Sequence, residues 1–256
     1  QNTPGDSWDY DSVQGFVLAD LLVEGRERKV LMQANKNGFY YVLDRVTGAF
    51  ISAEPFAEIN WARGIDSRTG RPIINPDAHY DHNGGAATIF PSNGGAHNWA
   101  PMSFNPNTGL VYIPATLGGS RTFVVDPTFD FNPNQMNTGV PRRGRGDPAL
   151  VANPRVPEKI GPEGSGDVLL AWDPILQQER WSVPGGGRSG GGTVTTAGNL
   201  VFQVINDGRL LAYTADQGEM LLEIETGLSE GMAPPITYML EGVQYVSLMG
   251  GTGQDG

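Results

Sequence analysis

One motif recurs three times along this chain of 256 residues: a glycine, a short apolar run, a polar turn and a second apolar run. The copies read GFYYVLDRVTGAFIS at 38–52, GDVLLAWDPILQQERW at 166–181 and GRLLAYTADQGEMLL at 208–222. The turns of the last two copies lie 41 residues apart, from Asp173 to Thr214. A period of this length is longer than one strand pair needs, so each copy is expected to be half of a larger repeating unit.

Another pair of apolar runs precedes each copy of the motif, at 15–35, 98–115 and 191–207. Each unit therefore contains four strands, and four strands in about 40 residues are typical of a β-propeller blade. We predict an all-β fold, a β-propeller of four-stranded antiparallel blades, with about three and a half blades in this chain. The predicted blades are 15–56, 86–184 with a long insertion at 116–165, 185–227, and a partial blade at 234–249.

The glycine and proline content supports the same fold class. The chain has 36 Gly and 19 Pro, and each costs a helix interior about 1 and about 3 kcal/mol respectively. Short strands joined by tight turns accommodate them well. Within the repeated turn, Gly48 and Gly218 share one position, where we expect a positive φ, and Gln177 takes that position in the middle copy.

Two stretches fall outside the repeat, 53–90 and 116–165, and both are rich in Asn, Pro, Gly and Arg. We predict that they are long loops on one face of the propeller, where binding sites commonly lie. For 125–160 an insertion without function is an equal alternative. The basic run PRRGRGD at 141–147 is predicted to be a solvated loop.

An arc of three and a half blades cannot close a ring, because each blade buries its two faces against its neighbours. Such an arc would expose apolar faces at both ends. We therefore expect a partner that completes the ring: either the missing N-terminal half in a longer polypeptide, or a second copy of the chain.

Composition excludes several classes of function. The formal net charge is −11 and the cations are scattered, which argues against a nucleic-acid partner. There is no apolar run long enough to span a membrane. The absence of cysteine removes disulfides, thiolate metal sites and cysteine nucleophiles.

Two short motifs were also considered as sites. HYDH at 79–82 lacks the helical i, i+4 spacing of zinc motifs, so a metal site in this loop is the weaker alternative to an ordinary polar loop. GGGRSGGGT at 185–193 lacks the ending of a phosphate-binding loop, so a tight interblade turn is favoured over an anion site.

Longer strings resemble quinoprotein alcohol dehydrogenases, periplasmic enzymes that use pyrroloquinoline quinone (PQQ) and a calcium or lanthanide ion on an eight-bladed propeller. The turn motif is similar to the A-x-D-x-x-T-G-x-x-x-W repeat of that family. The strings occur in the family's order and indicate the C-terminal half of the propeller. They are TPGDSWDYD at 3–11, ANKNGFYYVLDRVTG at 34–48, GAHNWAPMSFNPNTGLVYIP at 95–114, GGTVTTAGNLVFQ at 191–203 and PPITYMLEGVQYV at 234–246.

The resemblance implies a set of cofactor contacts. A cation at the position of Lys36 reaches the quinone oxygens in the family, and it would stabilise the negative charge that develops there. Asn98 and Trp99 align with residues at the cofactor edge, where amide and indole N–H groups can donate hydrogen bonds. Gly192 and Thr193 match a stretch that passes the same edge. Without the resemblance, each of these residues has a purely structural explanation. Lys36 would lie in a turn, Asn98 at the start of a strand, Trp99 in the core between blades, and Gly192 and Thr193 in an interblade turn.

The same resemblance places the catalytic aspartate upstream of Gln1, and it assigns the calcium or lanthanide ion to residues outside this chain. Asp6 and Asp9 are therefore expected to make turn and interblade hydrogen bonds. His97 is expected to be structural, because its side chain alternates to the other side of the strand from Asn98. No CxxCH motif is present, so no c-type haem is expected in this chain.

Together these observations predict part of a PQQ-dependent alcohol dehydrogenase. The implied reaction is oxidation of a primary or secondary alcohol by hydride transfer to the quinone, in the periplasm, with a cytochrome c as electron acceptor. The alternative is a non-catalytic β-propeller scaffold for protein–protein interaction. Lys36 and Asn98 distinguish the two, because a scaffold has no need to match cofactor-contact positions.

Overall fold

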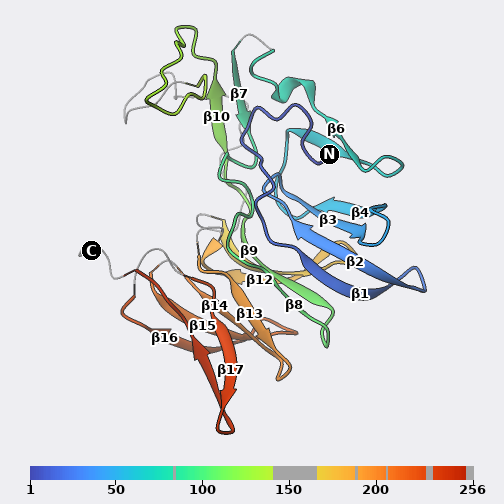
Figure 1. Ribbon diagram of the computed structural model, residues 1–256, viewed down its shortest axis with the longest axis vertical. Coiled ribbons are helices and arrows are strands. Elements are labelled where there is room, and N and C mark those ends of the chain that lie inside the picture. The colour runs from blue at the N-terminus through green and yellow to red at the C-terminus, as the bar shows by residue number, and fades with distance from the viewer. Residues whose placement is uncertain (83–84, 141–165, 188–189, 206, 229–232, 252–256) are drawn as a thin grey trace.

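A computed structural model describes residues 1–82, 85–140, 166–187, 190–205, 207–228 and 233–251. These residues form an all-β molecule of antiparallel sheets (Figure 1). The predicted basic loop at 141–147 and much of the insertion at 116–165 lie outside the described residues. No helix among the described residues is long and apolar enough to cross a membrane.

Three four-stranded sheets carry the repeated motif, and we call them blades 1, 2 and 3. Blade 1 has the order β1-β2-β3-β4, blade 2 the order β12-β11-β9-β8 and blade 3 the order β13-β14-β15-β16, followed by a hairpin of β17 and β18. The strands are β1 (Val17–Val23), β2 (Arg26–Ala34), β3 (Phe39–Asp44), β4 (Phe50–Pro55), β8 (Ser103–Asn105), β9 (Leu110–Thr116), β11 (Asp167–Asp173), β12 (Gln178–Pro184), β13 (Thr193–Thr196), β14 (Leu200–Val204), β15 (Arg209–Thr214), β16 (Met220–Glu225), β17 (Ile236–Leu240) and β18 (Val243–Ser247).

The blades pack face to face, and the alternation of side chains along each central strand explains why. On β3, Tyr40 and Val42 pack against blade 2, whereas Phe39 and Tyr41 point to the opposite side of blade 1. On β9, odd-numbered residues such as Val111 join the core with blade 1, and even-numbered ones join the core with blade 3. Both faces of these strands are buried, so they read as nearly continuous apolar runs.

The two stretches predicted as long loops contain regular structure, so that prediction was wrong for their described parts. The elements are β5 (Ala62–Asp66), β6 (Arg71–Ile74), the 3-10 helix η1 (Pro76–Ala78), β7 (Ala86–Ile89) and β10 (Arg121–Val124). β5 pairs with β6, and β7 pairs with β10. In the sequence, β8 and β9 of blade 2 lie between β7 and β10. These strands are short, and β7 pairs with a strand more than 30 residues later in the chain. No local sequence period therefore predicts them.

Residues from both stretches outside the repeat, 53–90 and 116–165, cover the β3 part of the free face of blade 1. Trp61, Ile89 and Phe123 pack with Phe39 and Tyr41 of β3 in one buried cluster. In Figure 1 β7 and β10 stand beyond blade 1, while blades 2 and 3 continue on its other side. The chain itself therefore covers the β3 part of this end of the arc, whereas Leu18 and Leu22 of β1 on the same face are exposed.

The repeated turn has the conformation expected from the sequence. Gly48, Gln177 and Gly218 have φ of +75°, +53° and +74°. In all three copies a β-bulge falls at the same place, next to Leu43, Trp172 and Tyr213 respectively. The prediction of a positive φ at this position is confirmed.

The turn position also touches the preceding blade. A Cβ on Gly218 would lie 2.7 Å from Cε3 of Trp181 in blade 2. At the other interface, Gln177 Nε2 donates to Ser52 Oγ of blade 1 over 2.9 Å. A large Trp therefore faces a Gly, and a small Ser faces a Gln, so that both interfaces are filled.

Candidate functional site

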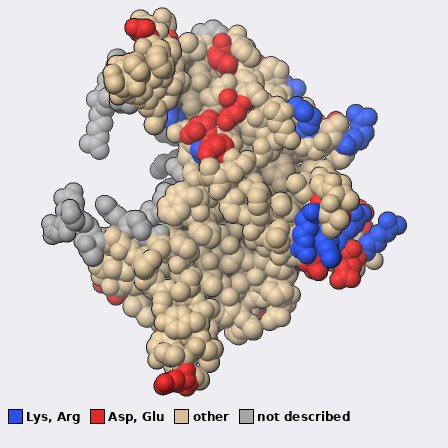
Figure 2. All heavy atoms as spheres, in the orientation of Figure 1, with Lys and Arg blue, Asp and Glu red and all other residues tan. Residues whose placement is uncertain are grey.

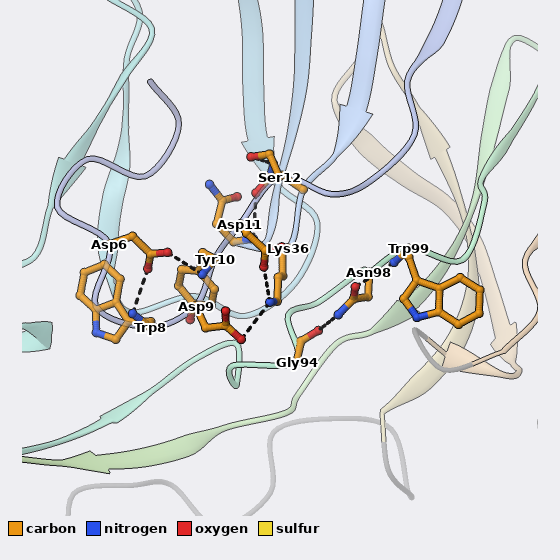
Figure 3. A network of polar contacts seen from close by, with 12 residues as sticks. Asp6, Trp8, Asp9, Tyr10, Asp11, Ser12, Lys36, Gly94, Asn98 and Trp99 are labelled. Atoms are coloured by element: carbon orange, nitrogen blue, oxygen red, sulfur yellow. Dashed lines mark hydrogen bonds and ion pairs between the residues drawn. The ribbon is translucent and has the colours of Figure 1, made fainter. Parts of the chain in front are cut away.

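The site begins with an N-terminal segment folded by Asp6. Its carboxylate accepts hydrogen bonds from the backbone N–H groups of Trp8 at 2.9 Å and Tyr10 at 2.7 Å, which confirms the turn role expected for it. Trp8 and Tyr10 are buried as anchors, and burial raises the pKa of Tyr10 well above its ordinary value. Since alternate residues are anchored, Asp9 and Asp11 project away from the core (Figure 3).

Lys36 meets these two carboxylates. It lies in the turn between β2 and β3, and only 6% of its side chain is exposed. Its Nζ lies 3.2 Å from Oδ2 of Asp9 and 2.5 Å from Oδ1 of Asp11 (Figure 3). An ammonium has three N–H donors: one donates to Asp11, Asp9 is an ion-pair partner, and no other partner of Nζ is found among the described residues.

Asp9 differs from its expected role as a turn or interblade hydrogen-bonder. Its φ of +73° is unusual for a residue other than glycine, and 66% of its side chain is exposed. Held in this conformation, its carboxylate reaches Lys36 while remaining accessible. In the sequence, Asp9 lies between Trp8 and Tyr10, and this alternation suggests that its side chain points away from the core. The contact with Lys36 could not be predicted in this way, because it joins two segments that no sequence pattern relates.

A glycine lets a third segment close over Lys36. Gly95 has a φ of +80°, and a Cβ there would lie 2.2 Å from Lys36 Cγ. The N–H of Ala96 donates to the carbonyl of Lys36 over 3.0 Å. Any side chain at residue 95 would displace the lysine, so the segment leading into blade 2 fixes where the Lys36 stem runs.

Asn98 and Trp99 follow directly on this segment (Figure 3). Asn98 Nδ2 donates to the carbonyl of Gly94 over 2.9 Å, and its Oδ1 accepts from the N–H of Trp99. Trp99 is 56% exposed, unusual for such a large apolar side chain. The core reading of Trp99 is therefore excluded, and its indole is free to contact a ligand.

His97 points the opposite way, as expected. It is 1% exposed, and its Nδ1 is 2.8 Å from the carbonyl oxygen of Pro114. Because a carbonyl only accepts, this nitrogen carries the proton and donates. Burial lowers the pKa of His97 to about 4, so the imidazole is neutral at neutral pH and remains a structural hydrogen-bond donor.

Gly192 and Thr193 lie at the interface of blades 2 and 3. A Cβ on Gly192 would meet Cδ of Pro101 at 2.7 Å, and the N–H of Thr193 donates to the carbonyl of Pro101 over 2.9 Å. The Thr193 hydroxyl is 2.8 Å from that of Ser103 and donates to the carbonyl of Tyr112. These contacts give both residues an interblade role, and their contact with a cofactor stays a prediction.

A cavity of about 620 Å³ adjoins the Lys36 cluster, and Asp9 is part of its wall. Its other walls are mixed, with aromatic and aliphatic groups beside a few polar ones. The guanidinium carbon of Arg121 lies 5.1 Å from the ring centre of Phe123. The lining residues are Asp6, Ser7, Trp8, Asp9, Tyr80, Asn93, Arg121, Phe123, Met136, Thr138 and Val140.

Comparison with known proteins identifies similar chains. The family model for the PQQ β-propeller domain of glucose/ethanol/alcohol dehydrogenases matches residues 1–60 and 169–246, more than half of the chain. The quinohemoprotein alcohol dehydrogenase of Comamonas testosteroni is 47% identical over 99% of this chain and 34% of its own. The 1-butanol dehydrogenase (cytochrome c) of Thauera butanivorans is 41% identical over 99% of this chain and 35% of its own.

Solved structures agree. The quinohemoprotein alcohol dehydrogenase ADHIIG from Pseudomonas putida HK5 has a TM-score of 0.82 and 43% identity, over 98% of this chain and 36% of that one. A europium-containing methanol dehydrogenase has a TM-score of 0.71 and 27% identity, over 95% of this chain and 40% of that one. These likenesses confirm the β-propeller fold class. The chain spans about a third of the length of the relatives that it matches.

Proposed function

The chain belongs to the family of PQQ β-propeller domains of glucose, ethanol and alcohol dehydrogenases, and we propose that it is part of an enzyme that oxidises a primary or secondary alcohol to the carbonyl compound. When bound, PQQ supplies a quinone that accepts the hydride from the alcohol carbon. The observation that carries the proposal is the contact of the buried Lys36 ammonium with the exposed Asp9 carboxylate at the wall of a cavity.

The donor set fits such a cofactor. Lys36 retains one N–H donor beyond its two carboxylate contacts, and a quinone oxygen is an acceptor of the kind that it would satisfy. A cation held in place before the reaction stabilises developing negative charge without having to reorganise. The exposed indole of Trp99 adds an aromatic surface next to Asn98. Lys36, Asn98 and Trp99 are thus proposed to bind PQQ, with Gly192 and Thr193 supporting the entry to blade 3.

Asp9 is proposed to accept the hydroxyl proton of the alcohol. Of the two carboxylates at Lys36, Asp9 is the one in the cavity wall, and it is the more exposed. A carboxylate within reach of the substrate can take the hydroxyl proton as the alcohol loses its hydride. This assignment replaces the expectation that the base lies upstream of Gln1, because the geometry offers a suitable carboxylate within the chain.

The remaining parts of the enzyme are proposed to lie elsewhere. Relatives of this chain are about three times as long. We keep the assignment implied by the resemblance, in which the calcium or lanthanide ion is bound by residues outside this chain. The ring would be completed by an N-terminal half or by a second copy. One relative is named as a dehydrogenase acting with cytochrome c, and we propose a cytochrome c as electron acceptor and the periplasm as the location.

The test uses the full-length protein that contains this chain, with PQQ and Ca²⁺ added. Asp9→Asn should lower kcat for alcohol oxidation by about 10²- to 10⁴-fold, and the Kd for PQQ, measured by fluorescence titration, should change little. Lys36→Met should weaken PQQ binding, whereas Lys36→Arg should largely restore it.

Two outcomes would contradict the proposal. If Asp9→Asn kept more than a tenth of wild-type kcat, Asp9 would not be the base. If wild type and Lys36→Met showed the same negligible affinity for PQQ, the non-catalytic scaffold would be the better account of this propeller.

A further inference from the structure

A second cluster of polar groups lies just after η1, outside the Lys36 site. His79, Asp81 and His82 each offer one ligand atom, and these atoms all lie within 4.8 Å of one another. The two imidazoles stack at 5.0 Å with an angle of 21° between their planes. The Asp81 carboxylate is close to both imidazoles: His79 Nδ1 is 3.4 Å from its Oδ1, and His82 Nε2 is 3.4 Å from its Oδ2.

These separations are too long for hydrogen bonds. An N–H···O bond spans about 2.7–3.2 Å, and the buried Nδ1 of His79 has no hydrogen-bond partner among the described residues. A buried polar atom without a partner is costly in a folded protein. By contrast, two ligands bonded to one tetrahedral ion at about 2.0–2.1 Å lie about 3.4 Å apart. The three ligand atoms, all within 4.8 Å of one another, lie close enough for one ion to draw them together.

We propose that His79, Asp81 and His82 form a binding site for a divalent transition-metal ion of the zinc type. Two imidazole nitrogens and one carboxylate are a ligand set suited to Zn²⁺, whereas calcium prefers oxygen ligands alone. The side chain of His82 is 71% exposed and that of His79 is 13% exposed. The site therefore has an inner ligand fixed by packing and an outer ligand at the surface, through which the ion enters.

The site would brace the segment that carries Asp9. The ring of His79 lies 4.7 Å from that of Trp8, and the Trp8 indole N–H donates to the carbonyl of Ala78 over 3.0 Å. Ser7 Oγ lies 3.3 Å from Asp81 Oδ2. An ion that fixes residues 79–82 would thus hold Ser7 and Trp8, directly before Asp9. The metal site stands on its own geometry; only this effect on Asp9 rests on the proposed function.

The experiment is a Zn²⁺ titration of the full-length protein by calorimetry after treatment with a chelator, with Co²⁺ absorption as a second readout. Wild type should bind one more equivalent of Zn²⁺ than His82→Gln or His79→Gln, and should show the visible bands of tetrahedral Co²⁺. Asp77→Asn is the matched control: it removes an exposed charge two residues from His79 and should bind as wild type does.

The proposal is overturned if wild type and both His variants bind Zn²⁺ with the same stoichiometry and affinity. His82 is at the surface, so its substitution tests the site even if His79→Gln fails to fold. Neither readout needs PQQ or alcohol. Normal zinc binding by an inactive Asp9→Asn variant would therefore separate this site from the proposed reaction, and a failure of either proposal would be recognised without the other.

Discussion

His97 and Asn98 are adjacent in sequence, yet their side chains lie in different environments. Asn98 is half-buried next to Trp99 in the proposed cofactor site. His97 is enclosed in the core of the blade, where its imidazole is neutral and donates to Pro114. Burial in this way keeps a chemically versatile residue out of the proposed cofactor site.

The depressed pKa of His97 predicts loss of stability in mild acid. The folded state keeps the imidazole neutral down to about pH 4, whereas the unfolded chain takes up a proton near pH 6.5. The unfolded state binds more protons in this window, so the free energy of unfolding should fall by about 2 kcal/mol between pH 7 and pH 5. Urea unfolding at the two pH values measures this. In His97→Gln this contribution should vanish; an unchanged pH dependence would show that His97 is not its source.

The repeated turn shows how one element is adapted to two interfaces. Gly218 lies under the Trp181 ring, and Gly48 occupies the same turn position in blade 1 with nothing within 4 Å of the place of a Cβ. Both have a positive φ close to +75°. The two glycines therefore share a backbone requirement, and only one of them has a packing requirement as well.

Alanine at these two positions should separate the two costs. Gly48→Ala should destabilise the protein by about 1–2 kcal/mol, since its left-handed backbone disfavours a side chain. Gly218→Ala should cost about 1–3 kcal/mol more, because the methyl group must displace the Trp181 ring. The measurement is the free energy of unfolding in urea. Equal losses for the two variants would show that Trp181 moves aside freely.

The two ends of the arc differ in how much of their apolar face is covered. Residues of 53–90 and Phe123 cover the β3 part of the free face of blade 1, but one face of the β17–β18 hairpin is apolar and exposed. Tyr238 pairs with Tyr245 and Leu240 with Val243 on that face, and their exposed fractions are 45%, 42%, 55% and 54%. Figure 2 shows few charged side chains over this part of the surface, whereas they crowd the hairpin of β1 and β2. The expectation of an apolar end face is confirmed at this end. At the blade 1 end it is confirmed only for the outer strand, where Leu18 and Leu22 of β1 are 59% and 68% exposed.

This face predicts that the 256-residue chain, expressed alone, associates with itself. Light scattering with size exclusion should give a mass above that of a monomer of 27.4 kDa. Leu240→Lys with Val243→Lys should shift the mass towards the monomer, and Thr128→Lys, on an exposed polar loop, should not. A wild-type chain that stays monomeric at high concentration would contradict the prediction.

The all-β class, the four-stranded unit and the positive φ in its turns could be predicted from the amino-acid sequence. These depend on alternation and turn chemistry within about 40 residues, which a local pattern records. Three further features became visible only in the folded chain: β7 pairs with β10, Trp181 faces Gly218, and Asp9 contacts Lys36. Each of these joins segments that are distant in the chain, and such contacts are selected by packing and charge in three dimensions. The sequence therefore indicated which residue types could form the candidate site. The contact between Asp9 and Lys36, on which its proposed chemistry depends, forms only when the chain folds.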